Sequence, residues 1–181
     1  MKKLLAILLA AAVITASLTA CGEGAASGAD TTAGTEDPAA DGVTAAQTHA
    51  VTLDNGNTVV INDDADAVLG KLGAHLDLME APSCVHEGTD RVYTYDGYTV
   101  TTSPRADGTQ YVAELSLTSD VVALDNGIYL GCTLAEVKKA FGDDFTESFG
   151  VLKYELPGVV ISVVADGDTV TGLTFSSAAN Q

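Results

Sequence analysis

The sequence predicts an α+β fold made of two αβββ units in tandem, in which each short helix packs on a small antiparallel sheet. Two observations predict this fold. Residues 60–73 align without gaps on residues 129–142, and in both stretches apolar side chains recur at helical spacing before a glycine. Strand-like segments separated by turn signals then follow each predicted helix.

Both predicted helices carry start and stop signals. Asp64 and Thr133 stand where an N-cap is wanted, and Thr133 forms a capping-box pattern with Glu136. Gly73 and Gly142 are expected just past the last turns, because glycine tolerates the backbone that ends many helices. The two helices are therefore expected to occupy equivalent places in their units.

Three strands are expected after each helix, and an additional hairpin that turns at Asn55-Gly56 precedes the first helix. Residues 75–90 are expected to form an extra loop of the first unit. One unit alone would have a marginal core, so the two either share a core or form one continuous sheet. The expected strands are 50–53 and 58–61 in the hairpin, 91–95, 98–102 and 110–118 in the first unit, and 151–155, 159–165 and 169–176 in the second.

The first 20 residues predict the signal peptide of a bacterial lipoprotein. Lys2 and Lys3 form a short positive segment, and residues 4–17 form an apolar run shorter than the about 20 residues that a membrane-spanning helix needs. The tetrapeptide Leu18-Thr19-Ala20-Cys21 matches the lipobox, in which small residues precede a cysteine whose thiol takes the lipid. We expect cleavage before Cys21 and a lipid on Cys21 that anchors the protein at the extracytoplasmic face of the cell membrane.

Residues 21–48 are expected to be the lipidated cysteine and a disordered tether, because this stretch is rich in Ala, Gly, Thr and Asp and poor in large apolar residues. Residues 49–122 then form the first unit with its hairpin, and residues 123–181 form the second. All 25 acidic residues but only six of the eight basic ones lie beyond Cys21, so the mature net charge would be −19. Such a chain is repelled by nucleic acid, and no nucleic-acid partner is expected.

Two further cysteines, Cys84 and Cys132, leave two alternatives open. They form the one disulfide available to them, which the compartment outside the membrane permits, or they remain separate buried thiols. A second pair of alternatives concerns Tyr93 and Tyr95, which share one face of a strand. They are a binding platform or, as we favour, core residues.

The residue patterns suggest no cofactor and no metal site. Aspartates gather at predicted helix ends and turns without the spacing of a calcium loop, and the histidines lack a zinc-binding pattern. Cys84 and His86 are close in the chain, but a catalytic dyad is defined by spatial geometry. The sequence contains neither a nucleophile elbow nor a phosphate-binding loop, so we expect that the protein is not an enzyme.

Two resemblances rest on particular segments. Residues 128–142 follow the pattern I-x-x-G-x-[ST]-x-x-E-V-x-x-x-[FY]-G, which resembles both the outer-membrane assembly lipoproteins of the BamE/SmpA type and the tandem repeats of β-lactamase-inhibitor-protein-like domains. Residues 81–100 with 127–145 resemble a family of uncharacterised lipoproteins from anaerobic Gram-positive bacteria. The first resemblance implies a short helical segment packed on a three- or four-stranded antiparallel sheet, and neither resemblance assigns a site residue here.

The combined expectation is a non-enzymatic cell-envelope lipoprotein that acts as a binding or interaction module on the outer face of the membrane. The alternative is a protein inhibitor or an envelope-assembly scaffold, as the two resemblances imply. The expected partners are the membrane, through the lipid on Cys21, and a protein or cell-wall component that the sequence does not identify.

Overall fold

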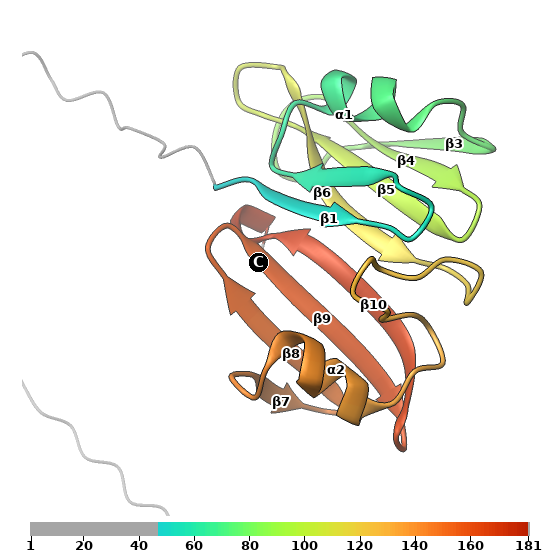
Figure 1. The fold of residues 1–181 in the computed structure, drawn as a ribbon. Coiled ribbons are helices and arrows are strands. Elements are labelled where there is room, and N and C mark those ends of the chain that lie inside the picture. Colours follow the sequence, from blue (N-terminus) through green and yellow to red (C-terminus); the bar gives the residue numbers. More distant parts are fainter. Residues whose placement is uncertain (1–46, 181) are drawn as a thin grey trace, which may run out of the picture. The chain divides into compact units, whose positions relative to one another are not determined.

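The computed structural model describes residues 47–180, which contain ten strands and two α-helices (Figure 1). These residues belong to one compact unit that spans Val43–Gln181. The expected signal peptide (residues 1–20), the lipidated Cys21 and nearly all of the expected tether (residues 21–48) lie outside the described residues.

The fold belongs to the mainly β class, so the expectation of an α+β fold is wrong. Strands account for 51% of the structure and helices for 14%. Each α-helix has only eight residues, α1 at Ala65–Leu72 and α2 at Leu134–Phe141, and single helices of that length cover only part of a wide sheet. The strand content exceeds the expected content because the predicted strands run longer and two further strands form.

Eight strands make one antiparallel sheet in the order β3-β4-β5-β6-β10-β9-β8-β7, and β1 pairs with β2 in a separate hairpin. The large sheet is two four-stranded meanders joined where β6 pairs with β10, so the halves form one continuous sheet. The strands are β1 (His49–Thr52), β2 (Thr58–Ile61), β3 (Asp77–Pro82), β4 (Thr89–Tyr95), β5 (Tyr98–Pro104), β6 (Gln110–Leu117), β7 (Thr146–Ser148), β8 (Val151–Leu156), β9 (Val159–Asp166) and β10 (Thr169–Ser177).

Four strands follow each helix, not three, so the expected αβββ unit is also wrong. The additional strands are β3 and β7, which form the two edges of the sheet. Strand β3 lies within residues 75–90, which were expected to be a loop. Every residue of β3 is exposed, so it lacks the alternation of apolar and polar side chains that marks a half-buried strand. Its hydrogen bonds to β4 make it a strand.

The helix ends are those that the sequence predicts. The Thr133 hydroxyl accepts a hydrogen bond from the Glu136 backbone N–H, while the Glu136 carboxylate accepts one from the Thr133 backbone N–H at 2.8 Å. The Asp64 carboxylate accepts from the Ala67 N–H at 2.9 Å. Gly73 and Gly142 follow the two helices with φ of 82° and 92°, a backbone conformation that glycine adopts without steric cost.

The two halves repeat one another bond for bond at the start of each helix. The Asn62 N–H donates to the Val112 carbonyl, and the Gly131 N–H donates to the Val170 carbonyl. Asn62 and Gly131 both have positive φ, of 70° and 109°. The Asn62 side-chain amide also donates to the Gly158 carbonyl at 2.7 Å, so this residue ties the first half to the β8–β9 turn of the second.

The repeat extends further back than the ungapped alignment of residues 60–73 with 129–142 indicates. The tetrapeptide Leu-Asp-Asn-Gly occurs at residues 53–56 and again at 124–127. Each forms the same turn, in which the Gly56 and Gly127 N–H groups donate to the leucine carbonyls at 2.9 Å. The turns then pair reciprocally: the Asp54 N–H donates to the Ala123 carbonyl, and the Asp125 N–H donates to the Thr52 carbonyl, both at 2.9 Å. A reciprocal contact of this kind is what a two-fold axis generates.

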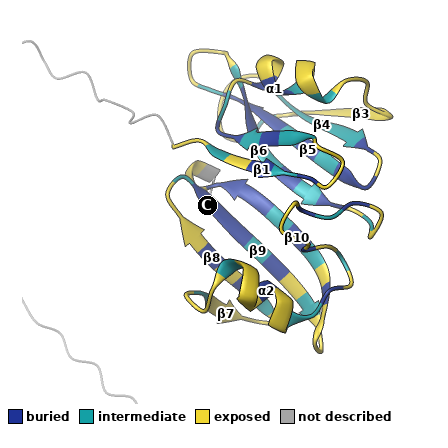
Figure 2. Cartoon of the chain, viewed as in Figure 1, coloured by how far each residue is buried: buried dark blue, intermediate teal, exposed yellow. Residues whose placement is uncertain are grey.

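One face of the large sheet carries the core, and the other carries polar side chains. Helix α1, helix α2, the β1–β2 hairpin and the second turn all contribute to one buried cluster with the inner-face residues (Figure 2). Ser116 and Thr174 lie opposite one another at the centre of the outer face, with their hydroxyls 2.9 Å apart. The outer-face row that contains them is Thr94, Thr99, Ser116, Thr174, Ser162 and Lys153.

We expect Val137→Asp to lower the free energy of unfolding by several kcal/mol, on the order of half the stability of an ordinary domain. Val137 is fully buried, so the new carboxylate would have no solvent and no partner. Ala135→Asp is the matched control, because Ala135 is exposed in the first turn of the same helix, where an acid is tolerated. Urea unfolding measures both variants, and equal losses would show that α2 does not bury Val137.

Candidate functional site

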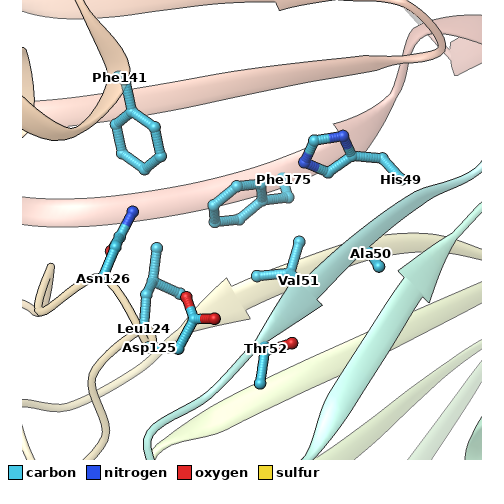
Figure 3. A pocket seen from close by; sticks show the side chains of 9 residues that line it. All are labelled: His49, Ala50, Val51, Thr52, Leu124, Asp125, Asn126, Phe141 and Phe175. Carbon is cyan, nitrogen blue, oxygen red and sulfur yellow. The ribbon is translucent and has the colours of Figure 1, made fainter.

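A pocket of about 120 Å³ opens on the inner side of the sheet, where the β1 strand meets the second Leu-Asp-Asn-Gly turn (Figure 3). Four segments that are far apart in the chain line it. Strand β1 contributes its four residues, the turn contributes Leu124 to Asn126, the end of α2 contributes Phe141, and β10 contributes Phe175. The joint between the halves therefore creates the pocket, which no single segment could form.

Three rings form the aromatic part of the pocket. The His49 imidazole stacks on the Phe175 ring with centroids 6.4 Å apart, and the Phe141 ring meets Phe175 edge-on at 6.2 Å. Phe175 is buried and belongs to the core, so it provides a fixed floor. Figure 3 shows Phe141 and His49 on either side of this floor, with their rings turned toward it.

The polar part of the pocket comes from the turn. The Asp125 carboxylate has no hydrogen-bond or ion-pair partner among residues 47–180. The Asn126 amide oxygen accepts a weak bond from the Ile128 N–H at 3.3 Å, which leaves the amide nitrogen available to a ligand. The backbone of the turn is fixed at both ends by its own bonds and by the bond from Asp125 to Thr52. Both side chains thus project from a rigid support.

The equivalent place in the first half is filled. There the Tyr98 side chain lies beside the first turn, accepts a hydrogen bond from the Asn57 amide at 3.0 Å and stacks on Tyr95 at 5.0 Å. The pairing of the strands gives Ile161 as the counterpart of Tyr98, because Tyr98 pairs with Leu117 and Ile161 with Phe175. Tyr98 and Ile161 are both fully buried, so the two halves place side chains of different size and polarity at this equivalent position. The pocket marks a departure from the two-fold repeat.

Partial burial lowers the pKa of His49 below its ordinary value, because the protein around it disfavours the charged form of the ring. The imidazole is therefore neutral at neutral pH. A neutral ring beside Phe175 acts as part of the aromatic wall and adds no positive charge to the pocket.

The residues that the sequence singled out lie elsewhere. Cys84 is an exposed free thiol after β3, and Cys132 is a buried free thiol before α2, so the structure has two separate thiols. Tyr95 and Tyr98 are buried, and Tyr93 packs against the core, in agreement with the core alternative. Cys21 lies outside the described residues. Within residues 47–180 no group of three metal-binding side chains occurs, and no helix has the length and apolar character to cross a membrane.

Sequence reasoning assigned no role in binding to His49, Asp125 or Asn126. One available signal was the recurrence of Leu-Asp-Asn-Gly, since a repeated turn of identical sequence indicates a shared contact. Comparison with family models, with curated proteins and with solved structures gave no match to this chain. The proposals that follow therefore rest on the residues and their geometry.

The lowered pKa of His49 predicts a pH-dependent contribution to stability. The unfolded chain binds the proton more readily than the folded protein, so this contribution is present above the ordinary pKa of histidine and is lost as the pH falls below it. Between about pH 7.5 and 5.5, where most carboxylates stay ionised, the unfolding midpoint of the wild type should fall more than that of His49→Gln. Parallel pH profiles for the two proteins would show that His49 is not desolvated.

Proposed function

We propose that this protein is a non-enzymatic binding protein, held by lipid on Cys21 at the outer face of the cell membrane, whose folded domain binds a small organic cation. The observation that carries the proposal is the pocket, which three aromatic rings line beside the Asp125 carboxylate, a group without a partner among residues 47–180. The cation is a free ammonium compound or the ammonium end of a larger envelope component.

The chemistry of the wall favours a cation. The faces of aromatic rings attract a positive charge, and cages of this type hold ammonium groups with about 0.5–2 kcal/mol per ring contact. The Asp125 carboxylate supplies the opposite charge, and the pocket is lined by no lysine or arginine, only by the neutral imidazole of His49. The Asn126 amide can donate to an oxygen carried elsewhere on the same ligand.

The charge of the whole chain favours the same class of ligand. The chain has 25 acidic and eight basic residues, a net charge of −17. The resulting negative potential raises the local concentration of cations and repels anions. A volume of about 120 Å³ accommodates a group the size of a tetramethylammonium ion and excludes large ring systems.

The membrane anchor follows from the N-terminal sequence and has its own test. Mass spectrometry of the membrane fraction should show a mature protein that begins at Cys21 with an added diacylglycerol. The Cys21→Ser variant should keep residues 1–20 or appear without lipid. A wild-type protein that keeps residues 1–20, or a serine variant that still carries lipid, would contradict the anchor without affecting the pocket.

Tetramethylammonium is the probe for the pocket, with neopentyl alcohol as a neutral molecule of similar shape. We expect tetramethylammonium to shift the NMR signals of His49, Asp125 and Asn126 in a saturable way, whereas neopentyl alcohol binds more weakly. Asp125→Asn and Phe141→Leu should each weaken binding by roughly 3- to 30-fold, which is the range for the loss of one charge or ring contact.

Asp54→Asn is the matched control, because Asp54 occupies the equivalent position in the first turn and does not line the pocket. It should leave the affinity within a factor of about two, because Asp54 is exposed outside the pocket and salt screens its charge. Equal binding of the neutral molecule, or equal loss from Asp54→Asn and Asp125→Asn, would contradict the assignment of the pocket to a cation.

A further inference from the structure

Strand β3 (Asp77–Pro82) is an open edge of the sheet that no described segment covers. It is the first strand in the sheet order, and Figure 2 shows it as exposed over its length. Two of its exposed side chains are large and apolar, Met79 at 64% and Leu78 at 39%, and Leu76 just before the strand is 74% exposed. A long, exposed and apolar edge is a site at which another strand adds to a sheet.

The opposite edge of the sheet is protected in the ordinary way. Strand β7 has only three residues, Thr146 to Ser148, and all three are polar. A strand of that length offers few hydrogen bonds and no apolar contact to an incoming chain. The repeat thus places two equivalent strands at the two edges, and only β3 is long and apolar.

The register of β3 shows which backbone groups face outward. The Ser83 N–H donates to the Gly88 carbonyl at 3.0 Å, which continues the β3–β4 register by one pair. Hydrogen-bonded pairs alternate along an antiparallel ladder, so residues 77, 79 and 81 direct their backbone groups to β4. Leu78 and Glu80 direct theirs away from the sheet. Pro82, which has no N–H, ends this free ladder.

The acidic residues near β3 do not close the edge. The Glu80 carboxylate accepts a hydrogen bond from the Arg91 guanidinium on β4 at 2.7 Å, so it lies along the sheet and not across the free ladder. The Asp77 carboxylate has no hydrogen-bond or ion-pair partner among residues 47–180, and Asp66 of α1 is near enough to act on the charge of Arg91. Two carboxylates therefore act on one arginine, and Asp77 adds a third opposite Thr94, so the charges near this edge are negative in sum.

We propose that β3 receives an extended segment of a cationic partner protein, which adds to the sheet as a ninth strand. Leu78 and Glu80 supply the backbone hydrogen bonds, and Leu78 and Met79 supply one apolar contact on each face. This surface lies beyond the proposed cation pocket and shares no residue with it. The partner segment carries alternating apolar side chains and lysine or arginine, because Asp77 and the net charge of −17 attract positive charge.

A second copy of the same chain is the poorer occupant. Two copies would each bring a net charge of −17, and every β3 edge would meet another acidic edge. Repulsion of this size keeps proteins monomeric. The oligomeric state of the free protein, measured at increasing protein concentration, therefore separates this alternative from the proposal.

The test uses residue-resolved amide hydrogen exchange on the full-length protein with its lipid site blocked by Cys21→Ser. The probe is a synthetic peptide in which Val and Thr alternate between terminal lysines. We expect the peptide to slow exchange of the Leu78 and Glu80 amides at least about tenfold, because those amides gain strand hydrogen bonds. The same peptide with glutamates in place of lysines should leave both rates unchanged.

Two variants distinguish the free ladder from the apolar patch. Leu78→Pro removes one outward N–H at an edge position that tolerates proline, and it should abolish the protection of Glu80. Leu78→Lys keeps the N–H and places a positive charge on the edge, where it repels the lysine peptide. It should weaken binding of that peptide at least tenfold, and it tests the edge even when the proline variant does not fold. Protection by the glutamate peptide, no protection by the lysine peptide, or protection that rises with protein concentration alone would each overturn the proposal.

Discussion

The antiparallel pairing of β6 with β10 is the contact on which the rest of the domain depends. It joins two four-stranded meanders into one sheet. The reciprocal hydrogen bonds between the two Leu-Asp-Asn-Gly turns connect the same two halves a second time. A half of this size would bury too little apolar surface to be stable alone. Joined through β6 and β10, the halves build a single core to which both helices and the β1–β2 hairpin contribute.

The same joint explains where the pocket lies. A two-fold repeat produces two equivalent places beside its axis, and their difference decides which of them is open. Tyr98 binds the first turn through Asn57, whereas its counterpart Ile161 has no polar atom to offer the second turn. Phe141 and Phe175 line the pocket beside the second turn, and the Asp125 carboxylate has no partner among residues 47–180. Binding is thus proposed in the half in which an isoleucine stands in the place of this tyrosine.

The sequence predicts those elements that local chemistry determines. The capping box of Thr133 and the glycines after both helices are found where their residue types require them. Strand β3 is different, because its own residues carry no strand pattern and pairing with β4 creates it. The fold class was wrong because both edge strands join the sheet, most of the predicted strands run longer, and each helix has only eight residues. The pocket could not be derived either, since its residues meet only after folding, although the repeated turn was visible. The turns are 71 residues apart (53 and 124) and the helices 69 (65 and 134), and this shift of two hides the turn from an ungapped alignment.

The two halves are expected to unfold as one cooperative unit, because the β6–β10 joint and the paired turns connect them. Native-state hydrogen exchange in low concentrations of denaturant measures this most directly. Amides in the centre of β5 and in the centre of β9 should exchange only through global unfolding, with the same free energy and the same denaturant dependence as the Asp54 and Asp125 amides. Exchange of one half through a smaller opening, while the other half stays protected, would contradict it.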